Sequence, residues 1–235
     1  MAKVYDAVYS AKDQPSDLDP MLDLLAELAD GGSALEFAVG TGRVALPLSG
    51  RGVAVRGIEL SPDMVQQLRA KPGADDVPVA IGDMTTTRFP GSFTLVYLVA
   101  NTIMNVTTQD EQLAVFANAA IHLRPGGYFA VEVIVPQLRS VPRGETGRVF
   151  TLATDHVGIE TFDDLVRQVA WSHHWMEVGG RLFKHSAPYR YVWPSELDLM
   201  ARLGGFRLQD RWAGWNREAF TSDSTSQVAV FEKVA

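Results

Sequence analysis

A glycine-containing loop near the N-terminus has the residue types needed to bind a ligand through the main chain. The segment Glu36-Phe37-Ala38-Val39-Gly40-Thr41-Gly42-Arg43 follows a strand-like run at 33–38 and precedes a helical pattern. Glycines there let a ligand approach the backbone, and the following helix N-terminus presents free N–H groups. Glycines in a strand-to-helix turn often serve only the turn. The loop therefore indicates a binding site only together with other features.

Two further strands end in residues that suit an adenosine. Glu59 ends the second strand, at the spacing where a carboxylate accepts both hydroxyls of a ribose. Asp83, in Gly82-Asp83-Met84, ends the third, where it can accept an amino proton of adenine while Met84 lies against the ring. Carboxyl ends of parallel strands are where open α/β sheets bind ligands. The alternative for Glu59 is a solvated strand-end carboxylate.

At these residues the chain resembles the class I S-adenosylmethionine-dependent methyltransferases. The resemblance covers roughly residues 5–135 and the two closing strands, and it is carried by 35–43, 57–64, 82–84 and 123–127. It implies S-adenosylmethionine as the cofactor. It also implies that Glu36 and Gly40 surround the methionine amino group and adenosine, Glu59 holds the ribose, Leu60 and Met64 flank adenine, and Asp83 with Met84 reads its edge. The implied cofactor site further includes Ala38, Gly42, Arg43 and Val99.

Two residues depart from the family pattern. Ala38 stands where glycine is more common. Alanine tolerates a strand-like backbone, with which the loop can still close, whereas a positive φ at this residue would be strained. Thr94 stands where the strand often has aspartate, and we do not expect cofactor binding to depend on it.

Within the family, two segments look like those of small-molecule enzymes, specifically the glycine and amino-sugar N-methyltransferases. They are Tyr5-Asp6-Ala7-Val8-Tyr9 and Asn101-Thr102-Ile103-Met104-Asn105. The resemblance implies an N-terminal segment folded over the cofactor, so Tyr9 is a candidate for contacting the sulfonium end, with Asn101 beside it. The alternatives are a core aromatic for Tyr9 and a turn or cap residue for Asn101.

The second half of the chain carries most of the aromatic and imidazole groups. All five tryptophans and four of the five histidines follow Pro136. His173 and His174 are adjacent on a predicted strand and so face opposite sides, which allows only one to line a pocket and argues against a shared metal ion. A general base is needed only for a protonated acceptor, and the candidates are Tyr9, His122, His173 and His174. Trp175 and Arg190, expected on the inward face of this segment, are the candidate substrate contacts. A small second core or a dimer contact is the alternative.

Hydrophobic periodicity and turn residues predict the elements that position these groups. The expected helices are 16–30, 43–48, 108–123 and 195–203, with another opening at Ser61-Pro62; Ser16 with Asp19 and Thr108 with Glu111 form capping boxes. The expected strands are 33–38, 53–59, 77–82, 93–99, 127–135, 206–211 and 227–233. This alternation predicts an α/β fold: a doubly wound, Rossmann-like seven-stranded sheet whose last strand is antiparallel. Within a single domain spanning 1–235, an antiparallel β insertion at 136–193, with a hairpin at Gly179-Gly180, covers the substrate.

Composition limits the classes of function. The 235 residues have 21 Lys and Arg against 28 Asp and Glu, a net charge of −7, which argues against a nucleic-acid partner. No cysteine is available for a disulfide or a thiolate metal site, and no metal is expected. Neither a leader peptide nor a membrane span is recognisable, so we expect a cytoplasmic location and a small-molecule partner. The predicted activity is methyl transfer to oxygen or nitrogen. A nicotinamide oxidoreductase and a non-catalytic binding domain remain alternatives, and the oligomeric state is open.

Overall fold

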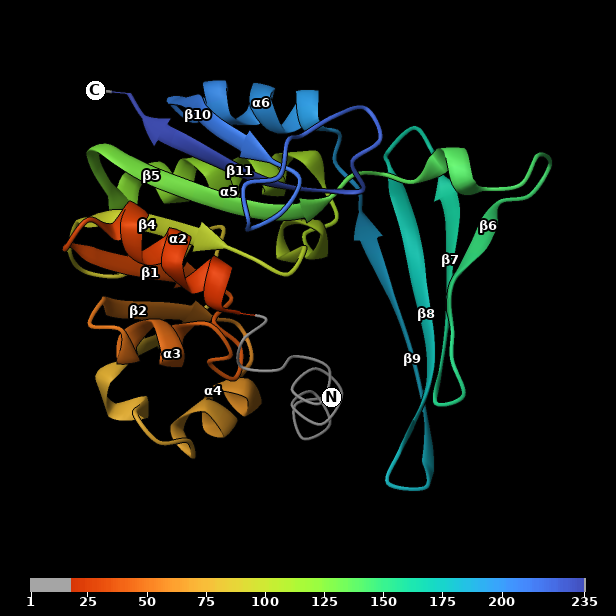
Figure 1. The fold of residues 1–235 in the computed structure, drawn as a ribbon, viewed down its shortest axis with the longest axis horizontal. Coiled ribbons are helices and arrows are strands. Elements are labelled where there is room, and N and C mark those ends of the chain that lie inside the picture. The colour runs from red at the N-terminus through yellow and green to blue at the C-terminus, as the bar shows by residue number, and fades with distance from the viewer. Residues whose placement is uncertain (1–17, 235) are drawn as a thin grey trace.

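The computed structural model describes residues 18–234, and its larger sheet has seven strands (Figure 1). These strands are β1 (Ser33–Phe37), β2 (Ala54–Glu59), β3 (Val79–Ile81), β4 (Phe93–Leu98), β5 (Leu123–Ile134), β10 (Phe206–Trp212) and β11 (Ser226–Lys233). Their order is β10-β11-β5-β4-β1-β2-β3. Neighbours among β1 to β5 pair in parallel, whereas β11 is antiparallel to both β5 and β10. The predicted sheet and its antiparallel last strand are confirmed.

Helices cover both faces of this sheet. They are α2 (Asp19–Ala29), α3 (Ala45–Gly50), α4 (Pro62–Arg69), α5 (Gln109–His122) and α6 (Pro194–Leu203), with short 3-10 turns η2 (Ala74–Asp76), η3 (Thr102–Asn105) and η4 (Leu138–Ser140). Apolar side chains of α2, α3 and α4 form one buried layer. Those of α5 and α6 form the other. The central strand β4 is buried along its whole length, because both layers pack against it.

The helix starts follow the capping signals with two exceptions. The Ser61 hydroxyl accepts from the Met64 N–H at the start of α4, and Thr108 forms the predicted capping box of α5. The first helix begins at Asp19; its expected cap, Ser16, lies outside the described residues. The second helix begins at Ala45 rather than at residue 43, because the chain still turns through Gly42, whose φ is +82°.

A smaller, antiparallel sheet stands across from the carboxyl ends of the parallel strands (Figure 1). It consists of β6 (Gly147–Leu152), β7 (His156–Asp164), β8 (Val169–Val178) and β9 (Arg181–Arg190), in that order. Gly179 and Gly180 form the β8–β9 hairpin with φ of +60° and +74°, which fits the turn that twisted hairpins prefer. The predicted antiparallel insertion is confirmed.

The two faces of this smaller sheet differ in what they contact. Ala170, Phe162 and Tyr189 lie on one face and belong to the buried cluster that also contains residues of β4, β5 and α5. We call this the inner face. The alternate residues of β8, which include Trp171 and Trp175, lie on the outer face.

Candidate active site

The glycine loop turns sharply through three residues with positive φ. Ala38, Gly40 and Gly42 have φ of +54°, +57° and +82°. The strand-like backbone considered for Ala38 is therefore wrong: the loop keeps the left-handed turn despite the side chain, at a cost of about 1–2 kcal/mol. A Cβ on Gly42 would lie 2.9 Å from Leu46, so this glycine permits packing. Among residues 18–234, a Cβ on Gly40 would meet only the Ala38 carbonyl, at 3.9 Å, so these residues leave open space beside it.

Glu59 ties the glycine loop to the start of α4. One carboxylate oxygen accepts from the Gly40 N–H at 2.9 Å, and the other accepts from the Ser61 N–H at 2.8 Å. The side chain is 8% exposed, so the alternative of a solvated strand-end carboxylate is wrong. Each oxygen has a second lone pair, so the carboxylate can still accept from a ligand hydroxyl.

Glu36 is a buried carboxyl beneath the same loop. It is 3% exposed, and the Tyr97 hydroxyl donates to it at 2.9 Å. Burial raises the pKa of Glu36 to about 8, although the Tyr97 hydrogen bond and the Arg43 charge act in the opposite direction. A cation placed beside this carboxyl would favour its ionised form.

The end of β3 forms a local turn. Asp83 is exposed, and its Oδ1 accepts from both the N–H and the hydroxyl of Thr85, each at 2.7 Å. Met84 is buried, and the Asn118 amide donates to its carbonyl oxygen at 2.6 Å. On the neighbouring connection Leu60 is 67% exposed, an unusual position for a large apolar side chain at a strand end.

The ends of β4 and β5 are tied together by side chains. Val99 is buried, and Asn101 has a φ of +62° and accepts from the Ile134 N–H at 2.7 Å. Asn101 therefore has the left-handed backbone of a turn residue, which agrees with its alternative interpretation, but its side chain binds β5 and does not cap η3. Glu132 accepts from the Ala100 N–H at 2.7 Å and from the indole N–H of Trp215 at 2.8 Å. Glu132 was not among the residues predicted from the sequence; its only signal there is a carboxylate within the apolar run of β5.

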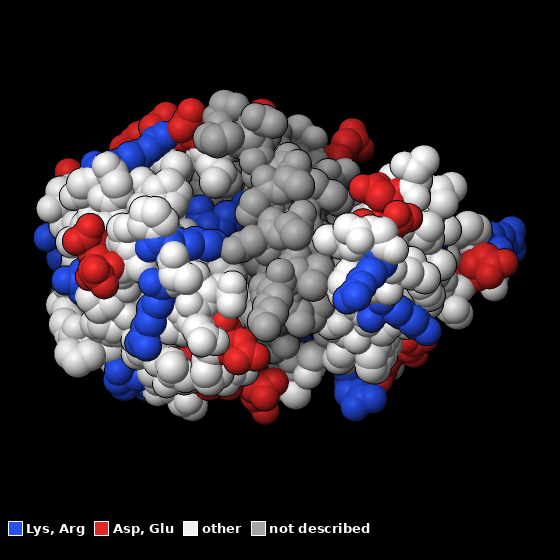
Figure 2. All heavy atoms as spheres, turned by 90° about the horizontal axis from the view of Figure 1, so that it is seen from below, with Lys and Arg blue, Asp and Glu red and all other residues white. Residues whose placement is uncertain are grey.

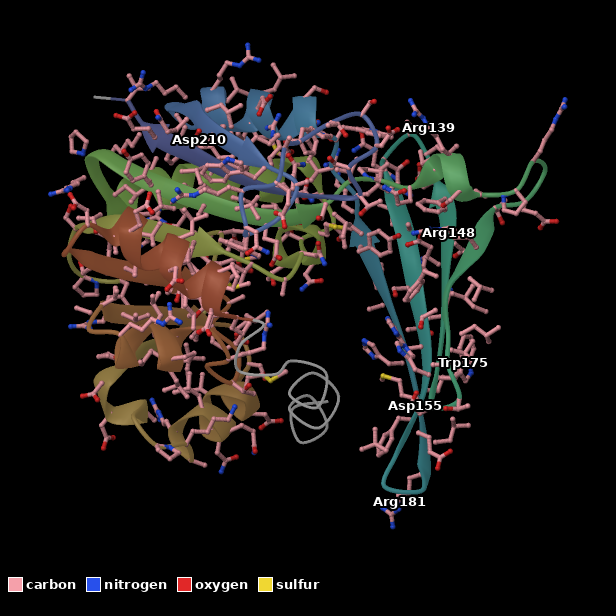
Figure 3. The ribbon with its side chains drawn as sticks, viewed as in Figure 1. Arg139, Arg148, Asp155, Trp175, Arg181 and Asp210 are labelled. Carbon is pink, nitrogen blue, oxygen red and sulfur yellow. The ribbon has the colours of Figure 1, made fainter. Side chains whose placement is uncertain are left out.

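His173 and Trp175 lie on the outer face of the smaller sheet. The His173 ring lies between those of Trp171 and Trp175, with centroids 6.3 Å from each, and its Nδ1 is 2.9 Å from the Ser186 hydroxyl. Figure 3 shows Trp175 on the side away from the larger sheet. The expectation that Trp175 points inward is therefore wrong, because strand alternation places it with His173.

His174 lies on the inner face, as expected from its being adjacent to His173 on the strand. Its Nδ1 is 2.9 Å from Nε2 of His156 on β7, and its Nε2 is 2.7 Å from the Ser172 hydroxyl. The two imidazole rings stack with centroids 5.2 Å apart. No role was predicted from the sequence for His156, which is one of the four histidines after Pro136.

Arg190 and His122 are built into the core. Arg190 is 4% exposed and donates to Gln112 and, at 2.6 Å, to Glu196. The expected substrate contact by Arg190 is therefore wrong, since both guanidinium ends are held by the protein. His122 is buried between Phe37 and Phe93, its Nε2 accepts from the Phe89 N–H, and burial lowers its pKa. Its Nδ1 lies 2.8 Å from the Asn118 carbonyl oxygen, so both ring nitrogens are held by the protein.

Comparison with known proteins identifies the fold's family. A methyltransferase domain model matches residues 34–127. The CcbJ methyltransferase from Streptomyces caelestis is 32% identical, with a TM-score of 0.87, over 100% of this chain and 96% of that one. This chain belongs to the class I S-adenosylmethionine-dependent methyltransferases. The nicotinamide oxidoreductase and the non-catalytic binding domain are thereby set aside.

Two curated methyltransferases are also similar to this one. The cypemycin N-terminal methyltransferase of a Streptomyces species is 25% identical over 206 residues, 87% of this chain and 84% of the relative. The dTDP-3-amino-3,4,6-trideoxy-alpha-D-glucopyranose N,N-dimethyltransferase of Streptomyces venezuelae is 31% identical over 134 residues, 56% of each chain.

The geometry of this methyltransferase fits its cofactor. Open space beside Gly40 admits a ligand, the buried Glu36 carboxyl suits a methionine ammonium group, and the exposed Leu60 offers an apolar surface to a planar ring. Tyr9, expected at the sulfonium end, lies outside the described residues.

Three further features bear on whether a metal ion, a membrane or a nucleic acid is a partner of this methyltransferase. Across residues 18–234 no three His, Asp or Glu side chains are grouped to hold a metal ion, and no helix is long and apolar enough to cross a membrane. Figure 2 shows Lys and Arg interspersed with Asp and Glu over the described part of one face. This arrangement differs from the continuous basic surface typical of nucleic-acid-binding proteins.

Proposed function

We propose that this methyltransferase acts on an amino nitrogen of a small molecule, either an amino sugar or a peptide N-terminus. One observation carries the proposal. Gly40, Glu59 and Glu36 lie together at the carboxyl ends of the parallel strands, and the inner face of the antiparallel sheet stands opposite those ends. The two curated relatives described above are named for methylation of a peptide N-terminus and of a sugar amine, which supports nitrogen as the acceptor atom.

In this proposal the cofactor lies along the carboxyl ends of β1 to β4. Glu59 accepts from the ribose hydroxyls with the lone pairs that Gly40 and Ser61 leave available. Glu36 supplies negative charge to the methionine ammonium, and Gly42, Arg43 and Ala38 shape the loop. Leu60, Met64, Asp83, Met84 and Val99 surround the adenine and adjoining methionine portion, with Asn101 fixing the β4 end and Tyr9 at the sulfonium.

Methyl transfer depends more on the alignment of the two reactants than on side chains that take part in bond breaking. The cofactor, when bound, supplies a methyl group attached to a positively charged sulfur. The neutral thioether that remains after the transfer is a good leaving group. The protein has to hold the acceptor nitrogen in line with that methyl group and exclude water. Orientation of this kind is worth about 7–11 kcal/mol of barrier in well-positioned reactions.

We place the acceptor between the carboxyl edge of the larger sheet and the inner face of the smaller sheet. His174 lies on that inner face, whereas His173 and Trp175 lie on the outer face. We therefore retain His174 as a candidate catalytic group and leave His173, Trp175 and the internally paired Arg190 out of the site.

The test compares matched acceptors. The full chain is incubated with S-adenosylmethionine and a dTDP-amino sugar, the same sugar nucleotide with a hydroxyl in place of the amine, and a short peptide with a free or an acetylated N-terminus. Mass spectrometry should detect added methyl groups only on an amine-bearing member of a pair. Methylation of the hydroxyl or acetylated partner, or of neither acceptor class, would overturn the proposal.

A further inference from the structure

Two imidazoles and a hydroxyl form a continuous hydrogen-bonded chain on the inner face of the smaller sheet. His156 on β7 contacts His174 on β8 through Nε2 and Nδ1 at 2.9 Å, and His174 contacts Ser172 through Nε2 at 2.7 Å. Phe150 packs against the edge of the His174 ring at a centroid distance of 5.4 Å. Both rings are half-buried, so the chain is held in one geometry while it remains accessible.

The His156–His174 contact requires one donor and one acceptor. A neutral imidazole has one N–H and one bare nitrogen, so two neutral rings satisfy the contact in either direction, with Ser172 reversing its role to match. Adding one proton to the pair preserves the N–H···N bond. Adding a second would place two N–H groups of two cations against each other at 2.9 Å, which is strongly unfavourable. The pair is therefore built to take up a single proton.

By strand register, the described strands bring Arg148, Glu160 and, at the hairpin end, Arg181 to the same inner face. Glu160 accepts from Arg148 and, at 2.8 Å, from the Tyr189 hydroxyl, so its charge is compensated. His185 on β9 is the register partner of His174 and is a third imidazole on this face. His173, adjacent to His174 on the chain, belongs to the opposite face.

We propose that His156 and His174 act together as the general base that prepares an amine acceptor for methylation, an inference that rests on the proposed function. The acceptor enters as an ammonium ion, and one proton moves from its nitrogen to the imidazole pair, which becomes a singly charged pair with its contact intact. The freed lone pair then forms the N–C bond as the C–S bond breaks, and the sulfur keeps the bonding electrons. One proton leaves to solvent for each methyl group added.

This arrangement predicts which acceptors the site takes. An amine that is mostly protonated at neutral pH needs the base before each transfer, and a second methylation needs it again. The inner face therefore suits primary and secondary amines. An alcohol gains little from an imidazole at neutral pH, because its proton is far more tightly held.

The kinetic test uses His156→Asn and His174→Asn, with His173→Asn as the matched control on the outer face. On an amine that the wild type methylates, each inner-face variant should lower kcat/KM at pH 7 by about 10²- to 10⁴-fold. The loss should shrink as the pH approaches the pKa of the amine, because free amine then needs no base. The double variant should lose little more than either single one. His173→Asn should keep the parental rate, and cofactor affinity should stay within about threefold throughout.

A second readout does not depend on turnover. In the full chain with selectively ¹⁵N-labelled histidine, NMR titration should show His156 and His174 taking up one proton as a unit, and His156→Asn should change the titration of His174 but not that of His173. Independent protonation of both rings would overturn the proposal. Parental kinetics of both inner-face variants on a methylated amine would overturn the base while the proposed function stands, whereas a wild type that methylates no amine would overturn both.

Discussion

Binding of S-adenosylmethionine should release a proton from Glu36. The carboxyl is 3% exposed, and burial raises its pKa to about 8, so it is mostly neutral in the free protein at pH 7. The proposed binding mode brings the methionine ammonium to this carboxyl. A cation within about 4–6 Å of a carboxyl lowers its pKa by about 1–3 units.

The size of the effect follows from these values. With a pKa of about 8, roughly nine in ten Glu36 side chains are protonated at pH 7. A downward shift of about 2 units leaves roughly one in ten protonated, so about 0.8 proton is released per cofactor bound. While the methionine ammonium stays charged, the same coupling should make binding about 25-fold tighter at pH 8 than at pH 6.

Isothermal titration calorimetry in buffers with different ionisation enthalpies measures this proton release. Glu36→Gln is the matched control, because its side-chain carbonyl can still accept from Tyr97 while the titrating group is gone. Proton release by the cofactor's own amino group occurs in both proteins, so the difference between wild type and Glu36→Gln reports the proton lost by Glu36. Equal proton release by wild type and Glu36→Gln would refute the reasoning.

Four further measurements test the site and its supports. Ala38→Gly should raise the free energy of unfolding by up to about 1 kcal/mol in urea titrations, because relief of the positive φ exceeds the added chain entropy; a decrease of that size would show that the methyl group packs. Glu59→Ala should weaken cofactor binding about 10- to 150-fold by calorimetry and lower the unfolding free energy, since the N–H groups it holds lose their acceptor; unchanged affinity would remove Glu59 from the site. Arg190→Met should lower stability at pH 7 by less than the roughly 3–5 kcal/mol typical of a fully buried pair, because the half-buried Glu196 loses its cation but keeps its hydrogen bonds to Gln109 and Gln168; a wild-type melting temperature with a raised acceptor KM would restore Arg190 as a substrate contact. Free Glu36→Gln protein should exceed wild type in melting temperature at pH 9, because a folded-state pKa raised to about 8 gives stability that is lost as the pH rises through that value; lower stability would contradict the pKa assignment.

Most of the fold follows from local signals in the sequence. Proline after Ser61, the Thr108–Glu111 pair and the Gly179-Gly180 turn each fix an element boundary through a single local interaction, and all three are confirmed. The antiparallel last strand follows from its short connection to the preceding one. Boundaries that depend on tertiary contacts were less predictable: the second helix begins at Ala45 because the glycine loop continues through Gly42.

The site was predictable where the chain itself sets the geometry. Glu36, Gly40 and Glu59 converge because parallel strands end at one edge of the sheet. Strand alternation also separated His173 from His174. Which of the two faces turns inward depends on how the smaller sheet packs against the core, and this information is not local, so Trp175 was placed on the wrong side.

Long-range pairing accounts for the other differences. Arg190 has the chemistry of an anion contact, but its partners Gln112 and Glu196 come from two helices whose approach no sequence pattern specifies. The His156–His174 contact likewise depends on the β7–β8 register. Register is set by the buried face as a whole rather than by the two residues that meet.

The central claim is that this methyltransferase transfers the methyl group of S-adenosylmethionine to an amine nitrogen. The most direct measurement is ¹³C NMR of the product formed from ¹³C-methyl S-adenosylmethionine and an amine acceptor such as the dTDP-amino sugar or the peptide. We expect the label to appear as an N-methyl resonance, with its chemical shift moving as the product amine titrates. An O-methyl resonance that does not titrate, or no transfer of label to any amine, would contradict the account.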